Sequence, residues 1–203
     1  MSRLLLSILG GLALALLFTA SPLGISVLAC VPIVALALTR HLESPDRRAL
    51  LIVLAAALLA RLAAIAVLFL LGWSDLSNMA MGSLTGDQAY NVSRAIRARD
   101  VLRGFGGLTH YEYFVTTDEY GRTSDISLLT LLQFLFGPAP FALRLLNAVI
   151  YIAGGAVLFR VIRPRFGMLP ATLGLLVVLF LPSLLYAAVS VLKEPLYFLA
   201  SSI

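Results

Sequence analysis

Long apolar runs dominate this sequence and restrict the chain to membrane folds. A helix that crosses a bilayer needs about 20 mostly apolar residues, with a range of about 17–25. Hydrophobic residues make up 61% of the chain, whereas soluble domains have about 45–50%. The runs of suitable length cover residues 4–20, 23–39, 49–72, 141–159 and 168–188. The sequence therefore predicts an all-α polytopic membrane protein with five complete spans and the start of a sixth near the C-terminus.

The first run has two interpretations. It follows Arg3, and a basic residue ahead of an apolar stretch is also typical of a cleaved signal peptide. We favour a helical hairpin, because the second run begins directly after Ser21-Pro22 and leaves no soluble start between them. Residues 1–48 then form an N-terminal transmembrane hairpin with its loop, and residues 49–203 form a second module. The single cysteine, Cys30, lies inside the second run and is predicted to be a small buried hydrophobe.

Arginines between the runs predict the orientation. Three lie within residues 40–48 and three within residues 160–165. Such residues concentrate in cytoplasmic loops, so residues 73–140 and the turn at 190–195 are expected on the outer side of the plasma (inner) membrane. The net charge of +5 is explained by this asymmetry, and we expect no nucleic-acid partner.

The predicted outer loop, residues 73–140, contains the one long polar interval, residues 73–125. Asp87 opens a segment whose apolar residues recur near the helical period, which predicts an amphipathic helix with arginines on its rim. The apolar residues of that helix are Ala89, Val92, Ile96 and Leu102. Residues 126–136 form an apolar run that is too short to cross, so we predict a second helix lying in the outer interface. Weak alternation over residues 111–121 predicts a small hairpin.

Two acids on the predicted outer side are candidates for chemistry. Asp87 at the start of a helix is suited to capping it, and it is equally suited to act as a general base at fixed depth above the membrane. Glu194, in Lys193-Glu194-Pro195, is either one half of an interfacial charge pair or a second catalytic acid. If the two carboxylates meet, they also offer oxygen ligands to a divalent cation, so a metal remains an open possibility.

Three further polar residues lie in or at the start of apolar runs. Arg61 falls near the centre of a span, where a charge is costly and usually faces protein or water. We expect it either to pair within the bundle or to line a polar cavity. Arg144 and Asn147 lie one turn apart at the start of another span and are expected to point toward the outer site.

The order of these segments resembles the N-terminal region of the GT-C-fold glycosyltransferases, which include protein O-mannosyltransferases and lipid A aminoarabinose transferases. The resemblance covers residues 49–203 and predicts a GT-C-like helical bundle with interfacial helices in its first large outer loop. The matching motifs are Gly86-Asp87-Gln88-Ala89-Tyr90, Leu135-Phe136-Gly137, Phe141-Ala142-Leu143-Arg144-Leu145-Leu146-Asn147, Arg163-Pro164-Arg165-Phe166-Gly167 and Ser190-Val191-Leu192-Lys193-Glu194. The chain departs from many relatives in having Gly86 beside Asp87, where they have a second acid.

This resemblance implies transfer of a sugar from a polyprenyl-phosphate carrier to a glycan, lipid or protein acceptor on the outer membrane face. Asp87 and Glu194 correspond to the catalytic acids. The candidate substrate- and phosphate-binding residues are Tyr90, Arg94, Arg144 and Lys193. Because the sequence stops about ten residues into an apolar helix, we expect it to be the N-terminal part of a longer enzyme. The alternatives are a transporter or flippase subunit, with Arg61 lining its pathway, and a noncatalytic membrane scaffold.

Overall fold

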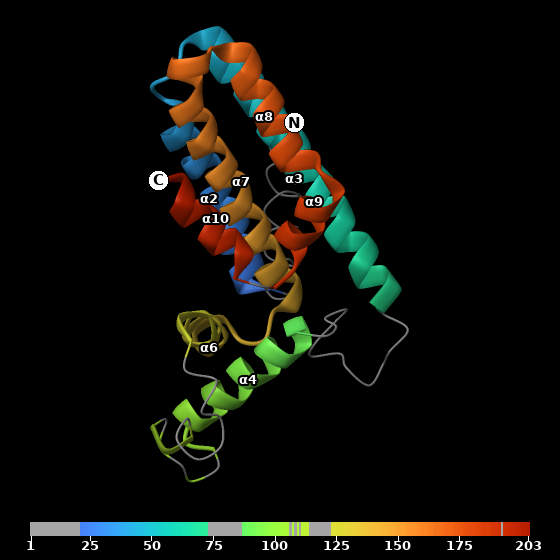
Figure 1. The fold of residues 1–203 in the computed structure, drawn as a ribbon. Coiled ribbons are helices and arrows are strands. Elements are labelled where there is room, and N and C mark those ends of the chain that lie inside the picture. The colour runs from blue at the N-terminus through green and yellow to red at the C-terminus, as the bar shows by residue number, and fades with distance from the viewer. Residues whose placement is uncertain are drawn as a thin grey trace, which may run out of the picture. The chain divides into compact units, whose positions relative to one another are not determined.

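The computed structural model describes residues 21–72, 87–105, 107, 109, 111–113, 123–191 and 193–203. Its parts group into unit 1, residues 1–67 and 141–203, and unit 2, residues 68–140. Within the described residues the chain is helical and contains no strand, which confirms the predicted all-α class (Figure 1). The helices are α2 (Pro22–Thr39), α3 (Ser44–Gly72), α4 (Asp87–Leu102), α6 (Ser124–Phe136), α7 (Pro140–Phe166), α8 (Met168–Phe180), α9 (Pro182–Val189) and α10 (Glu194–Ser202).

Among the described residues, three helices, α2, α3 and α7, are long and apolar enough to cross a membrane. They correspond to the predicted spans at 23–39, 49–72 and 141–159, so this part of the membrane prediction is confirmed. The predicted span at 4–20 lies outside the described residues. Cys30, which we predicted to be buried, is exposed on α2. The prediction failed because a helix that is apolar on every side need not bury each side chain in protein.

The helix α7 runs past its predicted end at residue 159 and continues through Pro164 to Phe166. Arginine side chains can lay their apolar stems along a helix while the charged ends reach water, so the basic residues at 160–165 do not end it. Gly167 follows with φ +85°, a conformation that glycine adopts without steric cost. The motif at residues 163–167 is therefore helical up to Phe166, and the chain turns at Gly167.

An ion pair joins the two basic loops of unit 1. Arg163 in the last turn of α7 donates to the carboxylate of Asp46 in the first turn of α3. Residues 40–48 and 160–165 therefore lie at one end of the unit, which we call the basic end. Which side of the membrane this end faces stays a prediction.

The predicted straight span at 168–188 is in fact two helices, α8 and α9, which meet at a bend of 60°. The bend falls at Leu181, whose backbone is extended with ψ 125°. Pro182 explains it, because proline disfavours a helical conformation for the residue before it and has no N–H to continue the helix.

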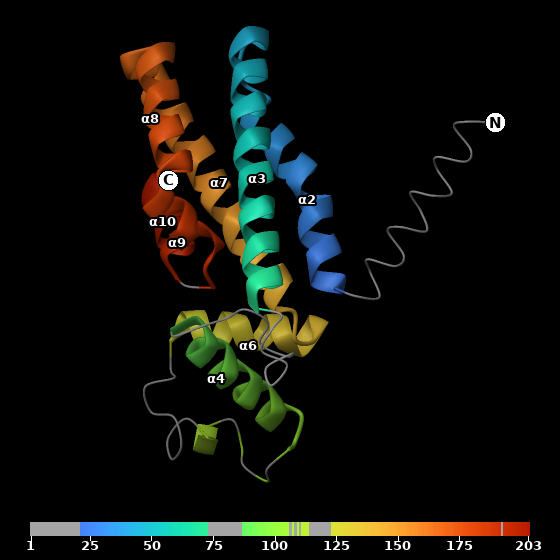
Figure 2. The same cartoon turned by 90° about the vertical axis from the view of Figure 1, so that its right-hand side faces the viewer.

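Together, α8 and α9 lie along most of the length of α7. Met168 follows the end of α7 through Gly167, and the carbonyl of Ser190, just after α9, accepts a hydrogen bond of 2.7 Å from Asn147 near the start of α7. From Asn147 to Phe166 is about 29 Å of helix at about 1.5 Å per residue, close to the bilayer core of about 30 Å. We therefore interpret α8 and α9 as one broken span. Figure 2 shows the pair beside α7.

The centre of α7 is packed closely on two sides. A Cβ atom added to Gly154 would lie 2.8 Å from the ring of Phe198 and 3.1 Å from the Cα atom of Leu199 on α10. One added to Gly155 would lie 3.1 Å from the side chain of Leu179 on α8. Small residues are thus needed here so that α8 and α10 can approach the α7 backbone.

In unit 2, α4 and α6 pack against each other (Figures 1 and 2). Arg103, just past α4, donates to the carbonyl of Phe134 on α6 at 3.1 Å, and its guanidinium lies 5.6 Å from the centre of the Phe134 ring. Ala98, Tyr113 and Ile126 form a small buried core. The two helices predicted for the outer loop are confirmed as helices.

Residues 111–113 are helical, so the hairpin predicted for 111–121 is wrong at its start, and residues 114–121 lie outside the described residues. Thr109 and Glu112 form a reciprocal cap for this turn. The backbone N–H of Thr109 donates to Glu112 Oε2 at 2.8 Å, and the N–H of Glu112 donates to Thr109 Oγ1 at 3.2 Å. This is the capping-box pattern of a helix start. The hydrogen bond from the Thr109 backbone N–H, with a second from its hydroxyl, lowers the pKa of Glu112.

Candidate functional site

Asp87 is the first residue of α4 and is exposed. An exposed carboxylate in a first helical turn is stabilised by the helix dipole, and it can still accept a proton from a molecule outside the unit. Tyr90, one turn along the helix, is 57% exposed. The guanidinium of Arg94 lies 4.9 Å from the centre of the Tyr90 ring. The structure thus groups three of the predicted site residues at the start of α4.

The buried face of α4 differs from the predicted one. Of the four apolar positions expected on that face, only Val92 is buried, and Leu102 is exposed. The buried residues of α4 are Gln88, Val92, Arg94, Ala95, Ala98 and Arg99. The sequence placed arginines on the rim because their helical spacing differs from that of the apolar residues, but long side chains can bury their stems and satisfy the charged group locally. Arg99 does so in part, because its Nε donates to Asp100 Oδ1 at 2.9 Å, while its buried Nη1 has no hydrogen-bond partner among the described residues.

Glu194 is the first residue of α10, and Pro195 occupies the first turn, as predicted. Glu194 and Lys193 are both exposed. The ammonium group of Lys193 lies 5.8 Å from the centre of the Tyr197 ring on α10. The segment therefore presents an acid and a base, side by side in the chain, on the surface of unit 1.

The backbone that precedes this charged pair is held by α7. Arg144 donates to the carbonyl of Val189 at 3.2 Å, and Asn147 donates to the carbonyl of Ser190 at 2.7 Å. Both side chains are buried. The last carbonyls of a helix lack helical partners, so these two donors cap α9 and fix the turn that leads to Lys193. This contact gives Arg144 a structural role, and its binding of phosphate stays a prediction.

Arg61 is fully buried and takes part in a second set of hydrogen bonds, at the end of α8 beside the helix break. It donates to the carbonyl of Leu179 at 3.0 Å and to Ala57 in its own helix at 3.1 Å. Pro182 has no N–H for the carbonyl of Val178, and the hydroxyl of Tyr151 donates to that oxygen at 3.3 Å. The carbonyls left open by the helix break are thus satisfied from α3 and α7.

Tyr151 links these helices and was not singled out from the sequence. Its ring lies 5.3 Å from the Arg61 guanidinium and stacks on the ring of Phe198, with ring centres 4.5 Å apart. Arg61 therefore pairs within the bundle, one of its two expected roles, with carbonyls as its partners. Three residues could have indicated this arrangement from the sequence. Pro182 lies inside one apolar run, and Arg61 and Tyr151 lie inside two others.

Asp87 belongs to unit 2 and Glu194 to unit 1. The structure describes each acid within its own unit, so their meeting stays a prediction. Among the described residues, no group of three or more His, Cys, Asp or Glu side chains is arranged to hold a metal ion. A divalent cation bound by Asp87 and Glu194 also stays a prediction.

These features define an all-α membrane protein in which a small unit containing α4 and α6 lies in sequence between two spanning helices. Comparisons with protein-family models, curated proteins and solved structures found no match.

Proposed function

We propose that this chain carries catalytic carboxylates of a membrane glycosyltransferase that moves a sugar from a polyprenyl-phosphate carrier to an acceptor on the outer membrane face. The observation that carries the proposal is the exposed Asp87 in the first turn of α4. Because α4 packs on the apolar helix α6, its first turn has a defined position within unit 2. A general base must be held in this way, since proton transfer requires an approach of about 2.6–3.2 Å.

In the proposed reaction, Asp87 takes the proton from an acceptor hydroxyl or amine as that group attacks the anomeric carbon. The bond from this carbon to the carrier phosphate breaks, and the phosphate leaves as an anion. Lys193 is the candidate to stabilise that anion, because it is exposed and cationic. Glu194 orients the acceptor or shares a cation with Asp87. Arg144 acts behind them by holding the turn through Val189.

Tyr90 and Arg94 are proposed to help bind the sugar and the phosphate of its carrier. Tyr90 offers an exposed ring at the start of α4. Arg94 is buried beneath it and has further contacts within the protein. Its proposed contribution is therefore to hold the Tyr90 ring and to add positive potential beside Asp87.

We do not propose a transporter, because the hydrogen bonds of Arg61 account for this residue without a substrate pathway. It is fully buried, and two backbone carbonyls accept hydrogen bonds from its Nη1 and Nη2, while its buried Nε has no hydrogen-bond partner among the described residues. If the chain is a noncatalytic scaffold, substitution of Asp87 should have no effect on sugar transfer. One experiment therefore distinguishes the scaffold hypothesis from the enzyme hypothesis.

The test is Asp87→Asn, made in the full open reading frame and assayed in membranes. We expect release of polyprenyl phosphate from a panel of polyprenyl-phosphate sugars to fall by about 10²–10⁴-fold, the contribution of a positioned general base. Binding of polyprenyl phosphate itself should not change, because the base does not contact the carrier. Asp125→Asn is the matched control, since Asp125 also lies in the first turn of a unit 2 helix. Full activity of Asp87→Asn, or an equal loss in Asp125→Asn, contradicts the proposal.

A further inference from the structure

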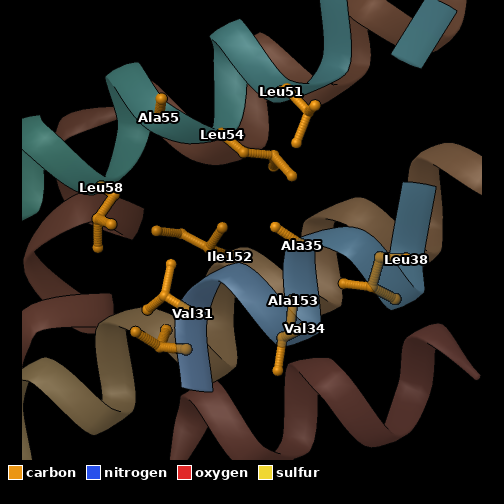
Figure 3. Close-up of a pocket in the computed structure, with 11 residues that line it drawn as sticks. Val31, Val34, Ala35, Leu38, Leu51, Leu54, Ala55, Leu58, Ile152 and Ala153 are labelled. Carbon is orange, nitrogen blue, oxygen red and sulfur yellow. The ribbon is translucent and has the colours of Figure 1, made fainter. Parts of the chain in front are cut away.

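Two adjoining cavities of unit 1 form a groove along one side of α3. The deeper cavity, of about 160 Å³, lies between α2, α3 and α7 (Figure 3). The outer cavity, of about 670 Å³, lies along the first turns of α3 at the basic end. Leu51 and Ala55 line both cavities. We call this continuous feature the α3 groove.

The deeper part of the α3 groove is wholly aliphatic. Figure 3 shows Leu54 and Leu58 on α3 facing Val31 on α2 and Ile152 on α7. A water molecule in a cavity needs about 2–4 polar partners, and the side chains here provide none. An empty space of this size would leave its lining without contacts on one side. The deeper part of the α3 groove is therefore chemically suited to binding a hydrocarbon chain.

The outer part of the groove is cationic. Ser44, Arg47 and Arg48 line it, and no acidic side chain does. Asp46, in the same turn of α3, is engaged by Arg163 of α7 and so does not neutralise these two arginines. Forked guanidinium groups beside a hydroxyl are well suited to a phosphate. The first turn of a helix adds positive potential.

The depth of the groove matches one leaflet of a bilayer. Arg48 and Leu58 lie ten residues apart on α3, about 15 Å at about 1.5 Å per residue. The hydrocarbon core of a membrane is about 30 Å thick, so the groove extends from a headgroup to about the bilayer midplane. A phosphate site at the rim, followed by an apolar slot of this depth, has the dimensions of a phospholipid.

We propose that the α3 groove binds one anionic phospholipid, with its phosphate on Arg47 and Arg48 and an acyl chain between α2 and α3. The site lies at the basic end of unit 1. Glu194 follows the turn at the opposite end, beside the start of α7. The proposal is therefore independent of the glycosyltransferase proposal.

The experiment uses the protein in nanodiscs of phosphatidylcholine with a minority of phosphatidylglycerol, and native mass spectrometry of the lipid that stays bound. Wild type should retain one phosphatidylglycerol in preference to phosphatidylcholine. Replacing both arginines, Arg47→Gln with Arg48→Gln, should reduce that preference about thirtyfold if each contributes as an arginine near an anionic surface does. Arg165→Gln is the charge control, because Arg165 is exposed on α7 and does not line the groove.

A second pair of variants tests the slot without removing a charge. Ala55→Phe places a ring where the two cavities join, and Ala56→Phe places the same ring on the neighbouring residue, which does not line either cavity. Both alanines are exposed, so neither change fills the protein core. Loss of the retained lipid in Ala55→Phe alone supports the proposal. Equal retention by these two variants, or no preference for phosphatidylglycerol in wild type, overturns it.

Discussion

Units 1 and 2 use their buried arginines differently. In unit 1, Arg61 donates to the carbonyl of Leu179, near the end of α8, and Arg144 donates to the carbonyl of Val189, the last residue of α9. In unit 2, Arg99 pairs with the neighbouring acid Asp100. Arg61 therefore stabilises the break in a spanning helix, where no water can satisfy the backbone, and Arg144 caps the end of α9. A charged residue inside a span is therefore a weak indicator of a substrate pathway when a proline-broken helix lies beside it.

The largest expected effect on stability comes from Arg61→Met. This change leaves the Leu179 carbonyl buried without its donor and removes the cation beside the Tyr151 ring. We expect a loss of about 2–4 kcal/mol in the free energy of unfolding, from a hydrogen bond with a charged donor, about 1.5–3 kcal/mol, and a cation–π contact, about 0.5–1 kcal/mol. Thermal unfolding in detergent measures it. Arg165→Met, at an exposed position, is the control and should change stability by less than about 0.5 kcal/mol. Equal stability of the two variants would contradict the structural role that we assign to Arg61.

A smaller effect is expected from Tyr151→Phe, and it should depend on Pro182. Loss of the hydroxyl leaves the Val178 carbonyl without its donor, which should cost about 1–3 kcal/mol. In a Pro182→Ala background, the N–H of Ala at position 182 becomes available to that carbonyl, so the same change should cost clearly less. A double-mutant cycle on unfolding free energies measures this coupling. Additive effects would show that the hydroxyl is not the substitute for the missing backbone donor.

Hydrophobicity alone was sufficient to predict the described spanning helices, because their length and apolar character do not depend on their neighbours. The α4 helix was also predictable from its periodicity. The break at Leu181 was missed, although Pro182 was visible, since an apolar run of this length looks continuous. The C-terminal end of α7 was misjudged because Arg160 and Arg163 can remain helical while reaching water.

The site was less predictable than the fold. A sequence shows which side chains can donate hydrogen bonds, but it does not show which backbone carbonyls need donors. The roles of Arg144 and Asn147 as caps of α9 therefore emerge only from the structure. Asp87 and Glu194, by contrast, lie at the helix starts that the sequence predicted. Both are exposed, as residues that meet a substrate must be.

The central claim is that Asp87 and Glu194 serve one site, and cysteine cross-linking in native membranes tests it most directly. In a Cys30→Ala background, Asp87→Cys and Glu194→Cys should be joined efficiently by a short bismaleimide. Asp87→Cys with Glu43→Cys is the matched control, because Glu43 is also exposed but lies at the basic end of unit 1. We predict a cross-link for the first pair and none for the second. Absence of a cross-link between positions 87 and 194, or an equal yield from both pairs, would contradict the account.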